Sequence, residues 1–351
     1  MRRLVFVTQQ VDPAHPALAA TVPKLRALAA RLDEVVVIAD GAAPGALPEN
    51  TRVHRFAARS RAGRGVRFEA ALARELARRP RPVAVVAHMC PIYAVLAAPL
   101  ARPLRIPVLL WFTHWRSSRT LRLAERLSNT VVSVDRRSFP LDSKKVRAIG
   151  HGIDLSEFPC RTEPPPHDDF RLVALGRYSR AKGLENVLRA VRAALDAGLD
   201  VRLETHGPAL NADERAHRAE LERLVAELDL AKRVRLGHAV LRSEVPKVLA
   251  RADAFVNNMR GGATDKAVYE AAAACVPVVA SNPVLDELLD GLDASLRFER
   301  ERPDELAERI AALASLPPGA RAALGRALRE RVAERHSVER WADRLLETVR
   351  R

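Results

Sequence analysis

The strongest constraint on this chain is an alternation of short apolar runs with helical patterns. Runs such as Leu4–Thr8 and Glu34–Asp40 are rich in β-branched and aliphatic residues, and segments with apolar residues three and four positions apart lie between many such runs. This alternation predicts parallel sheets with helices packed on both faces. The expected fold class is therefore α/β, with doubly wound parallel sheets.

The alternation stops once and then starts again. The interruption is EFPCRTEPPPHDDF at residues 157–170, which contains four prolines and no apolar periodicity. A chain of 351 residues is long enough for two domains that each bury a core. We predict a strongly basic N-terminal Rossmann-like domain over residues 1–160, a C-terminal Rossmann-like domain over 166–335, and a last helix over 336–351.

The net positive charge of the chain comes entirely from its first half. Residues 1–150 hold 26 Lys and Arg against 10 Asp and Glu, whereas the remainder holds 32 against 33. An excess of this kind indicates an anionic partner, such as a membrane surface, a phosphorylated lipid, an acidic glycan or a nucleic acid. The alternative is a chain that simply uses many arginines. A helix in the most basic segment, residues 59–82, is expected to turn Val66, Ala70, Ala73 and either Leu76 or Ala77 inward and its arginines outward.

The spacing of the cysteines bears on the redox compartment of the protein, and hydropathy bears on whether the chain carries a signal peptide or a membrane span. Cys90, Cys160 and Cys275 are odd in number and far apart in the sequence, and they form no CxxC pair. We therefore expect a reducing compartment, no disulfide framework and no structural zinc. The apolar run at the N-terminus is too short for a signal peptide, and no run of about 18 apolar residues is present to span a membrane.

The stretch RGGATDKAVYEAAAACVPVVASN, residues 260–282, reads as a glycine loop, a helix and a buried strand. Gly261 and Gly262 leave the backbone bare, and either Thr264 or Asp265 is suited to cap the helix. A helix N-terminus approached by glycines binds phosphate through backbone N–H groups. The alternative is an ordinary loop–helix–strand unit of an α/β domain.

Polar residues also follow the strands predicted for the first half. Thr8, His88, His114 and Gly150–Gly152 come at or after strand ends, where parallel sheets bind ligands. A single histidine at a strand end is commonly structural, and His151 is expected to pack in the linker.

Three segments of the second half resemble the retaining GT-B glycosyltransferases of family 4, which take a sugar from a nucleotide-sugar donor. LVALGRYSRAKGLENVLRAV is similar to the family's strand–GR–x–KG–helix unit, and RVRLGHAVLRSEVPKVLARADAFVNN to its strand–G–x–helix–AD–strand unit. The stretch at residues 260–282 is similar to the family's paired-glutamate segment. The resemblance covers residues 170–290 well and the first half loosely, through His114 and GHGID.

The resemblance implies a GT-B fold, in which two Rossmann-like domains face a central cleft and the last helix crosses back to the acceptor-side first domain. It implies catalytic roles for Arg177 and Lys182, whose cations would stabilise the departing diphosphate, and for His114, which would face the donor sugar. It further implies contacts to the donor from a set of residues near the helix start: Gly261, Gly262, Ala263, Thr264, Asp265 and Glu270. Glu270 would accept hydrogen bonds from ribose hydroxyls.

Two departures from the family pattern bear on activity. The family's first glutamate falls at Gly262, so a carboxylate that normally contacts the donor sugar is missing, and Asp265 is a candidate substitute. The loop after the first strand, QQVDPAHPAL, lacks the paired glycines often seen there. These departures leave open the choice of donor, the choice of acceptor and whether transfer occurs.

The function expected from the resemblance is a retaining glycosyltransferase of hexosyltransferase type. Its donor would be a UDP- or GDP-sugar, its acceptor a glycan or lipid-linked molecule, and its setting cell-envelope polysaccharide or glycolipid synthesis. No acidic metal-binding motif stands at a strand end, so neither a metal nor a cofactor is expected. The expected location is cytoplasmic, with peripheral contact of the basic half to the inner membrane face.

Two alternatives of other kinds stay open: a GT-B protein that binds nucleotide sugar without transfer, and a sugar-nucleotide epimerase. Nucleic acid is not expected as a partner, because recognition-helix motifs and stacking aromatics are lacking.

Overall fold

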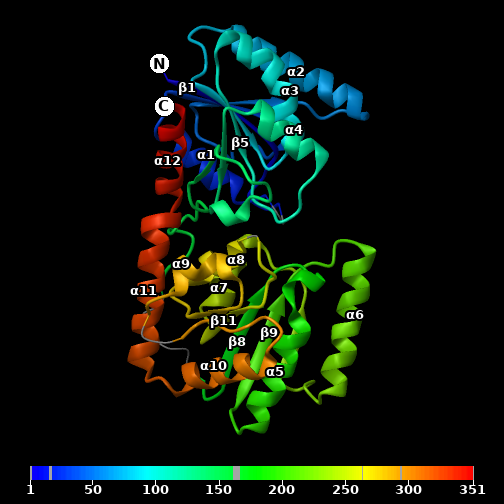
Figure 1. Cartoon of the computed structure of the whole chain (residues 1–351), viewed down its shortest axis with the longest axis vertical. Helices are drawn as coiled ribbons and strands as arrows, with labels where there is room; N and C mark the ends of the chain where they lie inside the picture. The colour runs from blue at the N-terminus through cyan, green and yellow to red at the C-terminus, as the bar shows by residue number, and fades with distance from the viewer. Residues whose placement is uncertain (1, 16–17, 161–166, 263, 293–294, 351) are drawn as a thin grey trace. The chain divides into compact units, whose positions relative to one another are not determined.

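The computed structural model describes residues 2–15, 18–160, 167–262, 264–292 and 295–350. By the density of contacts, the chain divides into two compact units, Met1–Asp154 with Arg335–Arg351, and Leu155–Glu334. Each unit is built around one parallel sheet with helices packed on it (Figure 1). The predicted class of two doubly wound α/β domains is confirmed.

The first unit contains a seven-stranded parallel sheet in the order β3-β2-β1-β4-β5-β6-β7. Its strands are β1 (Arg3–Val11), β2 (Glu34–Ala42), β3 (Thr51–Arg55), β4 (Ala84–His88), β5 (Val108–Trp111), β6 (Thr130–Ser133) and β7 (Val146–Ala148). Its helices are α1 (Thr21–Ala29), α2 (Arg61–Ala77), α3 (Pro91–Ala101), α4 (Arg119–Leu127) and α12 (Val338–Arg350). The central strands are buried on both faces, which explains their nearly continuous apolar sequences.

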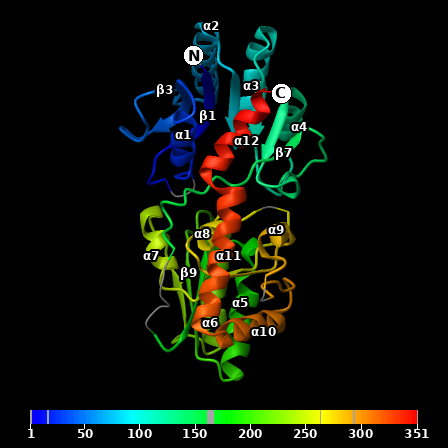
Figure 2. The ribbon, with the colours of Figure 1, turned by 90° about the vertical axis from the view of Figure 1, so that its left-hand side faces the viewer.

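The last helix, α12, belongs to the first unit and packs beside α1 (Figure 2). Trp341 of α12 is fully buried and meets Trp111 of β5 edge to face, with ring centroids 5.6 Å apart. The ammonium group of Lys24, on α1, lies 4.7 Å from the Trp111 ring and 5.3 Å from the Trp341 ring. The aromatic pair and the cation over it join the end of the chain to its beginning.

The basic helix α2 presents a different face to the core from the one predicted. Val66, Ala70 and Ala73 were expected to point inward, but Val66 is 67% exposed and both alanines are exposed as well. The buried residues are Phe68, Leu72, Glu75 and Leu76. The phenylalanine decides the orientation, because its ring meets Phe56 edge to face at 6.0 Å. Arg61, Arg67 and Arg74 are exposed on the other side, as expected.

The second unit contains a five-stranded parallel sheet in the order β10-β9-β8-β11-β12. Its strands are β8 (Phe170–Leu175), β9 (Val201–His206), β10 (Val234–Gly237), β11 (Ala254–Asn257) and β12 (Val278–Ala280). Its helices are α5 (Leu184–Asp196), α6 (Ala212–Glu227), α7 (Val245–Leu249), α8 (Lys266–Ala273), α9 (Asp286–Leu289) and α10 (Pro303–Ser315), and α11 (Pro318–His336) ends at the boundary of the unit.

The prediction that the chain has no disulfide is wrong. Cys160 and Cys275, which are 115 positions apart, form a disulfide within the second unit, and Cys90 is free. Cys160 follows the first residues of this unit, and Cys275 follows Ala274, the C-cap residue of α8. Sequence spacing gave no indication of the pair because the fold alone brings these two positions together. The disulfide also removes the argument from cysteine spacing for a reducing compartment.

Candidate functional site

The carboxyl edge of the second sheet gathers polar side chains from three neighbouring strands. The loop after β8 carries Lys182, the end of β11 carries Asn257 and Asn258, and Ser281 follows β12. The helix α8 starts beside the same edge, at Asp265. Since parallel sheets bind ligands at the carboxyl ends of their strands, this edge is the candidate site of the second unit.

Lys182 and Asp265 form an ion pair at this edge. The lysine ammonium also donates to the carbonyl of Leu175, at 3.2 Å, and the Asn257 amide donates to the Asp265 carboxylate at 2.7 Å. The Lys182 side chain is only 15% exposed. The cavity lined by Lys182, Gly176 and Asn257 measures about 10 Å³, which is room for no more than one water. An anion entering here would take the place of Asp265 as the partner of Lys182.

Arg177 belongs to the same loop but has a different partner. Its guanidinium donates to Glu214 of α6 at 2.9 Å, and the arginine side chain is 53% exposed. Glu214 itself is buried and also accepts a hydrogen bond from the backbone N–H of Leu210. The two cations predicted to share a diphosphate therefore each have a carboxylate of their own, and their common ligand stays a prediction.

The glycine loop before α8 has a backbone that disfavours a side chain at position 262. Gly262 has a φ of 95°, in the left-handed region where a side chain is strained. The Asp265 side chain caps α8 by accepting from the backbone N–H of Ala267, at 3.4 Å. Ala263, also predicted to contact the donor, lies outside the described residues. On this backbone, the glutamate that the resembled family carries at the corresponding position would be strained.

Three side-chain polar atoms are buried at this edge, and sequence reasoning chose Thr264 but missed Asn258 and Ser281. The Thr264 hydroxyl, the Asn258 side-chain oxygen and the Ser281 hydroxyl are each buried without a hydrogen-bond partner among the residues that the structure describes. Burying such a group unpaired costs on the order of 1–3 kcal/mol, so a ligand that pairs with it gains binding free energy. A polar residue directly after a buried strand was the sequence signal for Asn258 and Ser281. We used that signal for the first half of the chain only.

Glu270 lies on α8 and is 4% exposed. Its Oε1 atom accepts from the guanidinium of Arg242 at 2.6 Å and lies 3.3 Å from the ammonium of Lys266. Arg242 also bonds Glu157, at 2.5 Å. Burial lowers the pKa of Arg242, but Glu270 and Glu157 outweigh burial and the net shift is upward. Sequence reasoning chose Glu270 but missed both Arg242 and Glu157.

The histidines singled out in the first half belong to the other unit. His114 lies beyond the end of β5, is half-buried, and stacks on Trp115 with ring centroids 5.5 Å apart. Its Nδ1 accepts from the backbone N–H of Arg116 at 2.9 Å. His88 is buried and lies 3.2 Å from the Thr8 hydroxyl, and burial, together with Lys24, holds its pKa well below the ordinary value. His151 is also buried.

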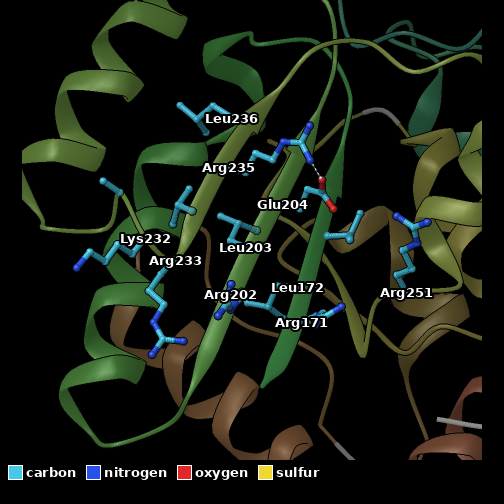
Figure 3. Close-up of a pocket in the computed structure, with 13 residues that line it drawn as sticks. Arg171, Leu172, Arg202, Leu203, Glu204, Lys232, Arg233, Arg235, Leu236 and Arg251 are labelled. Carbon is cyan, nitrogen blue, oxygen red and sulfur yellow. Dashed lines mark hydrogen bonds and ion pairs between the residues drawn. The ribbon is translucent and has the colours of Figure 1, made fainter. Parts of the chain in front are cut away.

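A separate groove of about 720 Å³ lies on the second sheet, beside the first residues of β8 and β9 (Figure 3). Six cations line it: Arg171, Arg202, Lys232, Arg233, Arg235 and Arg251. Carboxylates already pair with several of them: Asp169 with Arg171 and Arg202, and Glu204 with Arg235 at 3.0 Å. The groove is therefore largely charge-compensated, and it lies away from the carboxyl edge.

In the part of the chain that the structure describes, no group of three or more His, Cys, Asp or Glu side chains is arranged to hold a metal ion. Over the same residues, no helix has the length and apolar character needed to cross a membrane.

Comparison with known proteins identifies the fold. Residues 169–315, less than half of the chain, match the family model described as "Glycosyl transferases group 1". A sucrose-phosphate synthase from Thermosynechococcus elongatus is 18% identical with a TM-score of 0.76, and the match covers 100% of this chain and 98% of that one. Anabaena HepE in complex with UDP-glucose is also 18% identical, with a TM-score of 0.77 and 99% of each chain covered.

A glycosyltransferase from Rickettsia africae is 13% identical with a TM-score of 0.78, covering 99% of this chain and 97% of that one. No curated protein sequence matches the chain. At these identities the likeness shows the fold, which is GT-B.

Proposed function

We propose that the chain is a glycosyltransferase that moves a sugar from a UDP- or GDP-sugar to an acceptor. The observation that carries the proposal is the polar carboxyl edge of the second sheet, where Lys182, the start of α8 and Glu270 occur together. The group 1 glycosyl transferase match covers this region. The solved structures of similar fold include one bound to UDP-glucose.

In the proposed reaction the diphosphate of the donor takes the place of Asp265 beside Lys182. The backbone N–H groups at the start of α8 add a second source of positive potential. Arg177 leaves Glu214 and pairs with the same diphosphate. The two cations then stabilise the negative charge of the leaving group, which is the main catalytic contribution. Glu270 accepts hydrogen bonds from the ribose through its second oxygen, and His114 bonds a hydroxyl of the donor sugar.

We further infer that transfer retains the anomeric configuration. The acceptor hydroxyl attacks on the face that the diphosphate leaves, and the departing phosphate takes the proton, so no enzymatic nucleophile is required. Proton NMR of the product formed from an α-linked donor distinguishes the two outcomes: retention gives an α-linked product and inversion a β-linked one. No cofactor beyond the donor substrate is part of this proposal, so EDTA is expected to leave the rate unchanged.

The acceptor is proposed to be a glycan or lipid-linked molecule of the cell envelope, met at the inner face of the membrane by a cytoplasmic enzyme. The supporting observation is the exposed arginines of α2, which include Arg61, Arg67 and Arg74. Each cation near an anionic leaflet contributes about 1 kcal/mol to binding. Sedimentation with vesicles that contain 30% anionic lipid tests this part, and equal recovery with neutral vesicles would exclude it.

The decisive experiment is a thermal-shift screen against nucleoside diphosphates and their sugars, followed by an assay for released UDP or GDP. We expect stabilisation by one base class and donor turnover in the presence of a membrane extract that supplies acceptors. Lys182→Ala is expected to weaken donor binding at least about 10-fold, the loss of a charge-assisted contact. If no nucleotide stabilises the wild-type protein, the proposal fails.

A second candidate function is binding of a nucleotide sugar without transfer. Two observations favour it: Gly262 stands where the family has a glutamate, and Asp265 neutralises Lys182. Tight donor binding with no release of UDP or GDP across the acceptor extract would support this candidate over the enzyme. The substitution Gly262→Glu cannot test it cleanly, because the positive φ strains any side chain there.

A further inference from the structure

We propose that Arg242 and Glu157 are positioning residues for Glu270, and that through it they set how strongly the site distinguishes a ribose from a sugar lacking its hydroxyls. This inference rests on the proposed function, since it assigns two residues to the donor site described above. Neither residue belongs to the loop–helix segment that led to the site.

Arg242 connects two carboxylates from distant parts of the second unit. It is the first residue of the short 3₁₀ turn Arg242–Glu244 that follows β10. One terminal nitrogen bonds Glu270 at 2.6 Å and the other bonds Glu157 at 2.5 Å. The guanidinium also lies 5.5 Å from the centre of the Phe158 ring, and the Arg242 side chain is 15% exposed. A planar guanidinium held by two carboxylates and a ring has little freedom to rotate.

These contacts fix one oxygen of Glu270 and leave the other available. The described contacts of the Glu270 carboxylate, to Arg242 and to Lys266, both go to Oε1. No hydrogen bond from a described residue reaches Oε2. Two cations on one oxygen restrict the orientation of the carboxylate plane. The remaining oxygen is thus held in a defined orientation in which it can accept hydrogen bonds from a donor ribose.

Glu157 is itself held in place by the segment that carries it, Leu155–Cys160, which we call the anchor segment. Arg329 of α11 donates to the carbonyl of Phe158, at 2.5 Å, and also to the carbonyl of Ala273 on α8. The last residue of the anchor segment forms the disulfide to Cys275. The anchor segment is therefore tied to α8 at the end of the helix and, through Arg242, at Glu270.

A purely structural ion pair makes a different prediction from a positioning one. If Arg242 only stabilised the fold, its removal would weaken all ligands equally, in proportion to the folded fraction. If it orients Glu270, its removal weakens only ligands whose ribose hydroxyls that carboxylate contacts. The two roles are separated by comparing ligands with and without those hydroxyls.

The test uses calorimetry on the full chain with three probes: the preferred nucleoside diphosphate (UDP or GDP), its 2′,3′-dideoxy analogue, and inorganic pyrophosphate. We expect the wild-type protein to bind the ribonucleotide about 10-fold or more tightly than the dideoxy analogue, as for a contact to a charged group. Arg242→Met is expected to bring that ratio near one, with unchanged affinity for pyrophosphate. Arg242→Lys should restore part of the ratio, and Glu157→Gln, whose side chain is 34% exposed, should lower it about threefold.

Arg235→Met is the matched control, because Arg235 is also an arginine paired with a glutamate in the second unit, but is 76% exposed and lies on the separate groove. Its ratio should equal that of the wild type. An Arg242→Met or Glu157→Gln protein that keeps the wild-type ratio, or that loses affinity for all three probes alike, would overturn the inference. So would a wild-type protein that binds ribonucleotide and analogue equally, although donor turnover in that protein would leave the proposed function standing. Absence of all nucleotide binding would overturn both.

Discussion

Both units of the molecule bury an arginine among carboxylates, but the two clusters differ in how completely their polar groups are paired. In the first unit the amino-end cluster (Arg3, Glu34, Glu75 and Arg78) lies where β1 begins, and in the second the donor-helix cluster (Glu157, Arg242, Lys266 and Glu270) surrounds α8. Arg3 is fully buried. It bonds the Glu75 carboxylate at 2.5 Å and donates to three backbone carbonyls at 2.7–2.9 Å.

The two clusters also differ in their electrostatic balance. In the amino-end cluster burial dominates, and the pKa of Arg3 is lowered. In the donor-helix cluster the two carboxylates outweigh burial, and the pKa of Arg242 is raised. The first cluster lies at the amino end of its sheet, far along the strand from any ligand edge, and its terminal nitrogens are all used. The second leaves an oxygen of Glu270 without a hydrogen bond from any described residue. The same chemistry therefore serves stability in one unit and, by our proposal, binding in the other.

The largest expected effect is on stability and comes from the amino-end cluster. Glu75→Ala leaves Arg3 buried with only the more distant Glu34 carboxylate, at 3.9 Å, and breaking a buried pair costs about 3–5 kcal/mol. Urea denaturation is expected to show this loss, while the folded protein binds donor with wild-type affinity. Glu69→Ala on the exposed side of α2 is the control. A loss below 1 kcal/mol for Glu75→Ala would show that the amino-end cluster does not stabilise the fold in this way.

The second largest expected effect on stability comes from the disulfide, which ties the anchor segment to the donor-helix cluster. Replacing both Cys160 and Cys275 by serine is expected to lower the free energy of unfolding by roughly 2–4 kcal/mol, because the unfolded chain gains freedom. Cys90→Ser, at the free cysteine, is the control. Thiol titration of the denatured protein should find one free thiol without reductant and three after reduction. Three thiols without reductant would contradict the disulfide.

Acid is expected to destabilise the first unit. Burial, with Arg344 and Arg335, lowers the pKa of His336 to about 3, so the folded protein holds this histidine neutral while the unfolded chain protonates it near pH 6.5. The stability from this group is present above pH 6.5 and is lost progressively as the pH falls toward 3. Between pH 7 and 5.5 the loss from His336 is about 1 kcal/mol. His336→Gln should flatten this part of the pH profile, and an unchanged slope would exclude the assignment.

The smallest effect is expected where an arginine–glutamate pair is exposed. Arg235→Met removes the partner of Glu204 on β10, and an exposed ion pair contributes only about 0–1 kcal/mol. Denaturation in low and high salt should give free energies within about 0.5 kcal/mol of the wild type. A loss comparable to that of Glu75→Ala would show that burial is not what separates the clusters.

Much of the fold was predictable because it depends on local patterns. The runs at Leu4–Thr8 and Glu34–Asp40 lie within β1 and β2, and the helix expected from Lys266 begins there, capped by Asp265. Which face of a helix is buried was harder to predict, as Val66 shows, because several stripes of residues along α2 satisfy the same helical periodicity. The candidate site was predicted in part: Lys182 and Asp265 were both chosen, but their pairing with each other was not.

The sequence by itself determined the order of strands and helices and the glycine loop with its capped helix. Those features depend on residues a few positions apart, whose spacing sets which face is apolar and where backbone N–H groups are left open. Only the tertiary structure decided which charges are paired. Arg242 meets Glu157 across 85 positions, and Cys160 meets Cys275 across 115. No local periodicity encodes such contacts, since they exist only once distant strands and helices have packed into one unit.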